Sequence, residues 1–325
     1  MLAVLCRSYG GPESLDLTEV PAPSPGPGQV RIRVHAAGVN FADTLMIRGK
    51  YQEKPPLPLT PGLEVAGVVD ALGPGVTAPA VGTRVLALTD QGGFAEQVVA
   101  QENDVVPIPD HIDDVVAAGF AIAYGTSYGA LVWRAALRPG ETLLVHGAAG
   151  GVGLTAVECG RALGATVIAT ARGLDRTGLA KEHGATMAFD SEDPDLVAKL
   201  RAATKGNGMD VAYDPVGGTM FQTSLRTIAW EGRLLVIGFA SGEIPQIPAN
   251  ILLVKNATVH GFYWGSYRRR DPARFKASFA ELFEWLAAGR IRPLISHRLP
   301  LAQASKALEL LEKRRATGKV VLTLD

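Results

Sequence analysis

The stretch HGAAGGVGLTAVECGRALGATVIATAR, residues 146–172, places four glycines within seven residues, between two apolar β-rich runs. The run TLLVH, 142–146, leads into the glycines, and ATVIAT, 165–170, lies beyond them. Between the runs, Leu154, Val157 and Leu163 recur at helical spacing. The order strand, glycine-rich turn, helix, strand is the context in which such a turn holds a phosphate, so this stretch predicts a dinucleotide-binding βαβ unit.

Glycine in this turn lets the backbone bend tightly and approach a pyrophosphate closely. The N–H groups that open the following helix then face the anion, and the helix dipole favours its negative charge. The motif reads A-x-G-G-V-G, with Ala148 in the place of the first glycine. The alternative is a tight turn that only packs helix on sheet. The expected contacts to the pyrophosphate are Ala149, Gly150, Gly151, Val152 and Gly153.

The composition is that of a globular protein: 47% of the 325 residues are hydrophobic and 20% are charged. Lys+Arg and Asp+Glu both number 32, so no net charge favours nucleic acid or an anionic membrane. No apolar run approaches the roughly 20 residues that a bilayer span requires. The cysteines, Cys6 and Cys159, suggest reduced thiols rather than a disulfide framework. We therefore expect a cytoplasmic protein without a nucleic-acid or membrane partner.

The pattern of elements predicts an α/β protein with two domains. Residues 1–122 hold short β-like runs punctuated by glycine and proline, as in a partly open β-barrel. Residues 123–265 alternate strands with helices, which predicts a six-strand doubly wound parallel sheet. Its strands are expected at 142–147, 165–170, 187–190, 209–214, 233–238 and 258–262. Residues 266–325 carry two helices and the strand GKVVLTL, which we assign to the first domain.

The residues at the end of the second strand indicate which dinucleotide binds. An acidic residue there commonly takes the ribose 2′-hydroxyl of NAD, whereas this chain has Arg172, nineteen residues after Gly153. A guanidinium suits the 2′-phosphate of NADPH, and Arg176 offers a second cation. Asp175 lies nearby and argues in the opposite direction. Unless both arginines are only solvated loop residues, the sequence favours NADPH.

Three further segments, taken with the glycine turn, carry a family resemblance that spans essentially the whole chain. They are PGPGQVRIRVHAAGVN, TPGLEVAGVVDALGPGV and, near the end, ATGKVVL. The chain resembles the medium-chain dehydrogenase/reductase superfamily, and within it the zinc-independent quinone oxidoreductases related to ζ-crystallin. The resemblance implies a GroES-like catalytic domain, a Rossmann domain and NADPH-dependent reduction of a small quinone or enone.

The metal ligands of the zinc-dependent relatives are missing. Asn40 stands where those relatives have a catalytic cysteine, and Leu63 precedes Glu64 where they have a histidine. Their structural site needs four cysteines, and this chain has two. His35 and Glu64 remain as isolated candidates, so we expect no metal. A quinone or conjugated enone is already electrophilic and accepts a hydride directly, which suits such a site.

The resemblance also implies roles for single residues. Asn40 is expected near the nicotinamide as a catalytic and cofactor-binding residue, unless it is only a turn asparagine. Tyr51 is expected in the cleft as a hydrogen-bond or proton donor to the acceptor, or else as an aromatic lid. Thr126 is expected beside the nicotinamide.

Other cofactor contacts are expected where strands end, because ligands bind at the carboxyl edge of such sheets. Phe239 is expected to back the nicotinamide ring, with Gly238 and Ser241 beside it. Ser191 falls where some relatives, often with tyrosine, contact the adenosine. Arg314 or Lys319 is expected at the adenosine phosphate.

The remaining features of the sequence concern possible partners and alternative substrates. The segment HGFYWGSYRRR, 260–270, combines aromatic and basic residues but is weak support for RNA binding. The strand at 258–262 is expected to pair with its copy in a homodimer, as the resemblance suggests. Reduction of an enoyl thioester, with Arg268–Arg270 holding the carrier, and NADPH binding without turnover are alternatives to quinone or enone reduction, since fold does not decide function.

Overall fold

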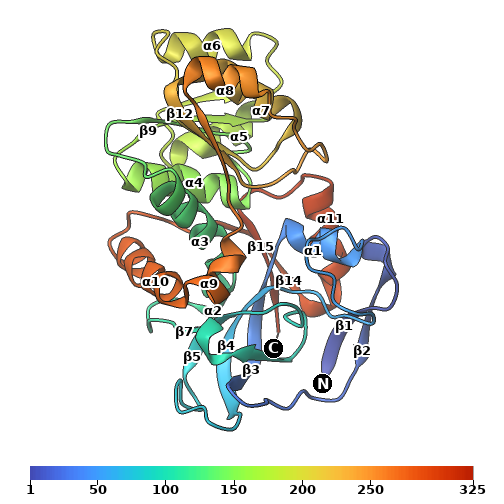
Figure 1. Cartoon of the computed structure of the whole chain (residues 1–325). Helices are drawn as coiled ribbons and strands as arrows, with labels where there is room; N and C mark the ends of the chain where they lie inside the picture. The colour runs from blue at the N-terminus through green and yellow to red at the C-terminus, as the bar shows by residue number, and fades with distance from the viewer. Residues whose placement is uncertain (325) are drawn as a thin grey trace. The chain divides into compact units, whose positions relative to one another are not determined.

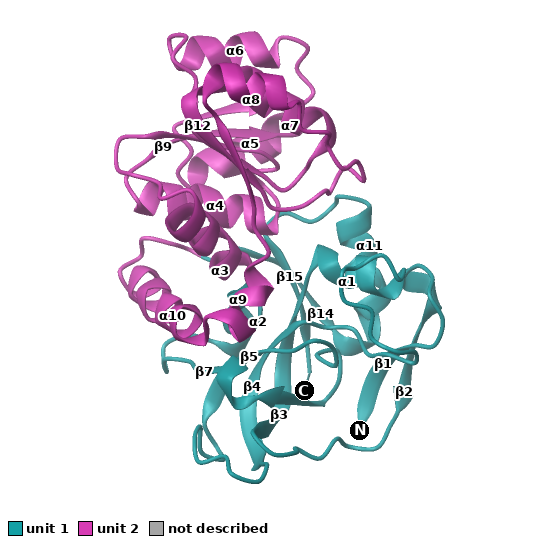
Figure 2. Cartoon of the chain, viewed as in Figure 1, with its two compact units in different colours: residues 1–122, 293–325 teal, residues 123–292 magenta. Residues whose placement is uncertain are grey.

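The computed structural model describes residues 1–324, and Figure 1 gives the course of the chain. The chain forms two compact units (Figure 2). Unit 1 consists of Met1–Ile122 and Pro293–Asp325, and unit 2 consists of Ala123–Arg292. The chain therefore leaves unit 1 once and returns to it once.

The second boundary differs from the sequence-based expectation, while the first falls at the expected residue. We expected the return to the first domain after residue 265, but residues 266–292 belong to unit 2. Helix α10 (Pro272–Ala287) explains the difference, because its Phe275 and Phe279 pack against Trp264 of the same unit, with ring centroids 5.1 and 6.2 Å away. Aromatic packing of this kind is not visible in the helical pattern of the sequence.

Unit 2 is built on a parallel sheet whose strand order, within residues 1–324, is β10-β9-β8-β11-β12-β13. The strands are β8 (Thr142–Val145), β9 (Thr166–Ala171), β10 (Met187–Asp190), β11 (Met209–Asp214), β12 (Ile228–Val236) and β13 (Thr258–Gly261). All six expected strands are present among the described residues, which confirms the doubly wound sheet. β12 starts earlier than expected because Ile228 already pairs with Met209, and the register shifts before Arg233 pairs with Val211.

The strand order places the glycine-rich turn at a topological switch point. From β8 the chain moves outward through β9 to β10, and then returns to the other side of β8 with β11. Ligands of open α/β sheets bind at the carboxyl ends of the strands where the order reverses in this way. The helices of the unit are α3 (Ala121–Gly129), α4 (Gly151–Ala162), α5 (Gly173–Glu182), α6 (Leu196–Ala203), α7 (Gly218–Thr227), α8 (Ala249–Lys255), α9 (Tyr267–Arg270) and α10.

Unit 1 is built around the long strand β3 (Gln29–Val39), whose alternating Val30, Ile32 and Val34 are buried. Its larger sheet has the order β14-β15-β3-β4-β5-β7 with β6 also paired to β3, and β1 pairs with β2 in a separate ribbon. The other strands are β1 (Leu2–Cys6), β2 (Leu15–Glu19), β4 (Glu64–Leu72), β5 (Arg84–Leu88), β6 (Gln97–Gln101), β7 (Val105–Pro107), β14 (Ile295–Pro300) and β15 (Lys319–Thr323). The helices are α1 (Phe41–Ile47), α2 (Asp114–Ala118) and α11 (Ala304–Glu312).

The C-terminal strand β15 returns to unit 1, as expected. It runs antiparallel to β3, and Val320 lies opposite Val39. This register brings Lys319 next to the residue that follows β3, Asn40, although the two are 279 positions apart in sequence.

Helix α10 has 16 residues, which is fewer than the roughly 20 needed to span a bilayer. Among residues 1–324, no helix has both the length and the apolar character needed to cross a membrane.

Candidate functional site

The glycine-rich turn connects the buried strand β8 to helix α4 at the switch point. Gly147 adopts φ 58°, a conformation that favours glycine, and Gly150 is the N-cap of α4. A Cβ on Gly153 would lie 2.1 Å from the carbonyl oxygen of Gly147, so helix and turn approach too closely for any side chain there. No side chain of the described residues caps this helix, and its first N–H groups are thus available to an anion.

A buried histidine, which the sequence analysis did not single out, holds the start of this turn. The imidazole of His146 lies 2.7 Å from Thr170 Oγ1 through Nδ1 and 2.9 Å from Ser224 Oγ through Nε2. Burial lowers the pKa of His146 below its usual value, so the ring is neutral at physiological pH. The ring thereby links the carboxyl ends of β8 and β9 to α7. In the sequence, the only indication of this role is that His146 directly precedes the glycine-rich turn.

Arg172 lies where the sequence analysis expected it, directly after β9 and at the N-cap of α5. Its side chain is about half exposed (51%), and its Nε forms an ion pair with Glu192 Oε1 at 2.8 Å. Ser191 lies in the same region, because its N–H donates to the carbonyl of Ala171 at 2.9 Å. Arg176 is one helical turn further along α5. The candidate adenosine-end residues thus gather at the ends of β9 and β10.

The loop after β12 lies against the loop after β11. The N–H of Ser241 donates to the carbonyl of Val216 at 2.9 Å, and a Cβ built on Gly217 would lie 3.2 Å from the ring of Phe239. The buried carboxylate of Asp214 stabilises the loop after β11, because it accepts the N–H groups of Val216 and Gly217. Gly238 and Phe239 therefore lie at the carboxyl edge of the sheet.

Thr126 is buried on α3, which is tied to the start of α4. The hydroxyl of its neighbour Ser127 donates to the carbonyl of Val152 at 3.0 Å and lies 2.8 Å from the hydroxyl of Thr155. The helix that carries Thr126 is consequently fixed to the glycine-rich turn by polar contacts within unit 2.

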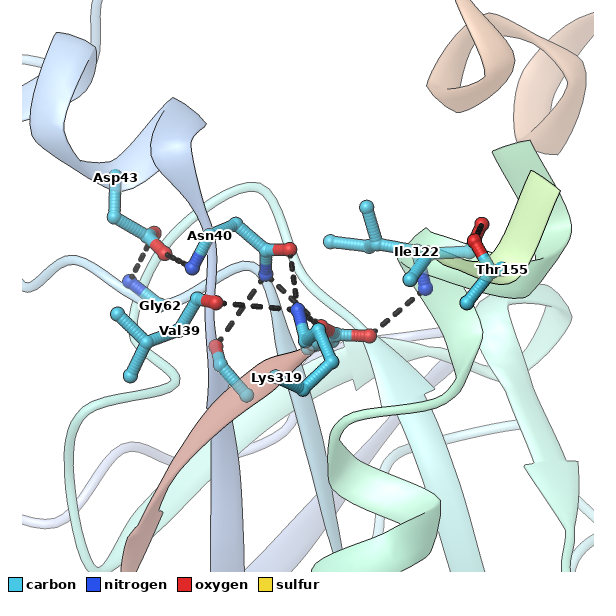
Figure 3. Close-up of polar contacts among 10 residues, drawn as sticks. Val39, Asn40, Asp43, Gly62, Ile122, Thr155 and Lys319 are labelled. Atoms are coloured by element: carbon cyan, nitrogen blue, oxygen red, sulfur yellow. Dashed lines mark hydrogen bonds and ion pairs between the residues drawn. The ribbon is translucent and has the colours of Figure 1, made fainter. Parts of the chain in front are cut away.

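In unit 1, Asn40 belongs to a buried polar cluster (Figure 3). The ammonium of Lys319 donates to Asn40 Oδ1 at 2.6 Å and to Glu64 Oε1 at 2.8 Å. Asn40 Nδ2 donates to the same carboxylate oxygen at 2.9 Å. The other carboxylate oxygen, Glu64 Oε2, accepts the N–H of Ile122 at 2.8 Å. We call these three side chains, Asn40, Glu64 and Lys319, the Asn40 cluster.

We expected Lys319 or Arg314 at the adenosine phosphate, and the structure places the Lys319 ammonium among acceptors of unit 1. Its third acceptor is the carbonyl of Val39 at 3.1 Å, so all three N–H donors of the ammonium have partners within unit 1. The residue is only 6% exposed. The cause is the register of β15 on β3, which no local sequence feature specifies.

Asp43, on α1, supports the backbone of the same cluster. Its carboxylate accepts the N–H of Asn40 at 2.8 Å and the N–H of Gly62 at 3.1 Å, so it connects the segments that carry Asn40 and Glu64. Burial raises the pKa of Asp43 from 3.8 to about 7, against the effect of these two hydrogen bonds. We therefore assign Asp43 a structural role.

Tyr51 is half buried and packs against the hydrophobic core of unit 1. The interpretation of Tyr51 as an aromatic lid over the acceptor stays a prediction. A role in donating a proton to the acceptor stays a prediction.

A zinc ion does not fit the Asn40 cluster. Both oxygens of Glu64 accept N–H groups, one of them from an ammonium, and the neighbouring side chains supply an amide and the hydrocarbon of Leu63. Zinc requires thiolate, imidazole or carboxylate ligands in sufficient number. Within the described part of the chain, no group of three or more His, Cys, Asp or Glu side chains is placed to hold a metal.

The fold, the residues around the glycine-rich turn and the Asn40 cluster are together typical of two-domain, dinucleotide-binding oxidoreductases. Comparison with known proteins agrees with this class. Residues 26–110 match the alcohol dehydrogenase GroES-like domain, and residues 151–287 match the family described as zinc-binding dehydrogenase. A quinone oxidoreductase-like protein 2 homolog from Nematostella vectensis is 41% identical over 98% of this chain and 88% of its own length.

Two solved structures are also similar over the full length of both chains. A mycobacterial protein complexed with NADPH is 34% identical with a TM-score of 0.94. The quinone oxidoreductase of Escherichia coli, also complexed with NADPH, is 29% identical with a TM-score of 0.93. The chain belongs to the zinc-independent quinone oxidoreductase family of medium-chain dehydrogenases/reductases, which are oxidoreductase enzymes.

Proposed function

We propose that the protein reduces quinones or α,β-unsaturated carbonyl compounds by direct hydride transfer from NADPH, without a metal. In this proposal the glycine-rich turn and the start of α4 bind the pyrophosphate, and Arg172 and Arg176 bind the 2′-phosphate. Asn40, Tyr51, Thr126 and Phe239 contact the nicotinamide or the acceptor.

The observation that carries the choice of NADPH is the guanidinium at the end of β9. Arg172 is half exposed at the position where an acidic residue would bind the ribose of NAD, and its ion pair with Glu192 is exposed on both sides. An exposed ion pair contributes at most about 1 kcal/mol. A phosphate can therefore replace Glu192 at little cost and gain a charge-assisted contact.

The choice of acceptor follows from the chemistry of the Asn40 cluster. Oxidation of an alcohol needs a group that polarises its oxygen and takes its proton. The cluster offers instead an amide and a buried ion pair whose charged atoms already have partners. A quinone or enone needs no such activation, because its conjugated system accepts the hydride, so positioning and exclusion of water are sufficient.

We also propose a homodimer in the cytoplasm, with β13 as the strand that pairs with its copy. β13 lies at one end of the described strand order, and Leu253 and Val254 of the neighbouring α8 are each 78% exposed. Light scattering on the purified protein tests this, and replacement of Leu253 by glutamate is expected to favour the monomer. A wild-type monomer at micromolar concentration would contradict the proposal.

The test of function is loss of reduced-nicotinamide absorbance with a quinone, a short enone and an enoyl-CoA as acceptors. We expect selective use of NADPH with the quinone or the enone. Arg172→Glu is expected to raise the KM for NADPH about 10- to 100-fold, since charge-assisted hydrogen bonds contribute about 1.5–3 kcal/mol, and to leave the KM for NADH nearly unchanged.

Glu192→Gln is the matched control, because it removes the competing carboxylate and leaves Arg172 in place. Its KM for NADPH is expected to stay equal or fall. Equal use of NADH by the wild type would refute the role of Arg172. Turnover of enoyl-CoA alone would identify an enoyl-thioester reductase, and tight binding of NADPH without any turnover would identify a binding protein.

A further inference from the structure

The Asn40 cluster fixes which way the carboxamide of Asn40 points. Its oxygen accepts from the Lys319 ammonium at 2.6 Å, and its nitrogen donates to the Glu64 carboxylate at 2.9 Å (Figure 3). The amide is therefore held between a cation on its acceptor side and an anion on its donor side.

The reversed amide would be strongly disfavoured. A 180° rotation would turn the NH2 group of Asn40 toward an ammonium, which has no acceptor, and its oxygen toward a carboxylate, which has no donor. Both contacts are buried, where unpaired polar groups and like charges cost most. The two neighbours thus enforce the same orientation, and neither depends on a bound ligand.

The amide keeps limited hydrogen-bonding capacity for a ligand. One lone pair of Oδ1 is left after the contact with Lys319, and the second N–H makes only a long 3.4 Å contact with the carbonyl of Gly38. Oδ1 can only accept a hydrogen bond from a ligand, and the N–H can only donate one. Reversal of the amide would exchange these two groups and present a donor where an acceptor is needed. Orientation therefore decides what Asn40 can recognise.

We propose that Lys319 is a positioning residue that acts through Asn40: its buried ammonium sets the orientation in which the Asn40 carboxamide meets the cofactor or acceptor. The inference deepens the proposed function and rests on it for the identity of the ligand. Lys319 is suited to this task because the pairing of β15 with β3 fixes its backbone, and three acceptors fix its head group.

The test must separate this role from the support of folding and from a direct contact with phosphate. Lys319→Met alone leaves the Glu64 carboxylate buried without its counter-ion, which endangers folding. Glu64→Gln alone leaves the Lys319 ammonium buried without its counter-ion in the same way. The informative variant is therefore the neutral pair, Glu64→Gln combined with Lys319→Met, compared with the wild type. The comparison is made twice, once in proteins that retain Asn40 and once in proteins that carry Asn40→Ala.

In the Asn40 background, we expect the neutral pair to lower kcat/KM about 10- to 100-fold relative to the wild type, the usual cost of a misplaced group. In the Asn40→Ala background, we expect a further loss below about threefold, because residues acting through one another are not additive. Equal losses in both backgrounds would show that Lys319 supports the fold generally and would overturn the inference.

Binding of 2′-phospho-ADP-ribose, which has the phosphates of the cofactor but lacks nicotinamide, tests the phosphate contact. We expect its Kd to differ by less than about twofold between the wild type and the neutral pair, within the range of uncoupled sites. Substantial weakening would assign Lys319 to the phosphates and overturn the inference. If the wild type neither binds this ligand nor turns over, the proposed function itself fails.

Nuclear magnetic resonance of the side-chain amide of Asn40 tests the orientation without any turnover. The two N–H resonances, assigned by Asn40→Ala, are expected to be well separated in the wild type and to lose this separation in the neutral pair. Unchanged resonances would refute the positioning role even in an inactive protein.

Discussion

Replacement of Asp43 by asparagine is expected to remove a large pH dependence from the stability of unit 1. The Asp43 carboxyl is completely buried and accepts two backbone N–H groups, from Asn40 and Gly62. Burial nevertheless dominates and raises its pKa from 3.8 to about 7. Asparagine has nearly the same shape and carries no charge at any pH.

The magnitude follows from proton linkage. Between pH 3.8 and about 7, the folded chain keeps a proton on Asp43 that the unfolded chain has released. Stability from this group therefore falls as pH rises through that window and is constant above it. Each pH unit corresponds to about 1.4 kcal/mol, so the free energy of unfolding of the wild type should fall by about 4 kcal/mol relative to Asp43→Asn.

The assay must report on unit 1. The four tryptophans lie at positions 133, 230, 264 and 285, all in unit 2, so their fluorescence follows that unit only. Hydrogen exchange of unit 1 peptides, measured for wild type and variant between pH 4 and 8, isolates the effect, with tryptophan fluorescence as internal control. Parallel pH profiles for the two proteins in unit 1 would refute the reasoning.

Two further substitutions test the local geometry of unit 2. Gly153→Ala would place a Cβ 2.1 Å from the carbonyl of Gly147, so we expect NADPH affinity to fall more than about tenfold, with about 1–3 kcal/mol lost to overpacking. Gly178→Ala, also helical but with open space around its Cβ, is the control, and equal effects at both positions would contradict the argument. Asp271→Ala removes the cap of α10, where the carboxylate accepts the N–H of Arg274 at 3.1 Å, and should lower the Tm by about 2–4 °C for a loss of about 1 kcal/mol. An unchanged melting curve would show that other contacts hold this helix end.

Local pattern was sufficient for the cofactor-binding half of the protein. The glycine motif, the apolar runs around it and the arginine that follows are all within about thirty residues of one another, and the order of elements alone predicts a parallel sheet. The start of α10 is also specified locally, because Asp271 is its N-cap and Pro272 its first residue, both common helix start signals.

Packing between distant segments was not visible in the same way. Residues 266–292 belong to unit 2 and not, as we expected, to the first domain, because a helical pattern shows which face is apolar but not which partner covers it. The contacts of His146 could not be predicted either, because its hydroxyl partners come from β9 and α7.

The sequence by itself determined the class of fold, the glycine-rich turn and the family, because each depends on residues that are neighbours in the chain or on motifs in a fixed order. Only the tertiary structure decided the contacts of Lys319. Its position follows from β15 pairing with β3, a contact across 279 positions whose register depends on the whole sheet. A lysine near a C-terminus can equally meet solvent, a phosphate or a buried carboxylate, and the register places this one beside Asn40 and Glu64.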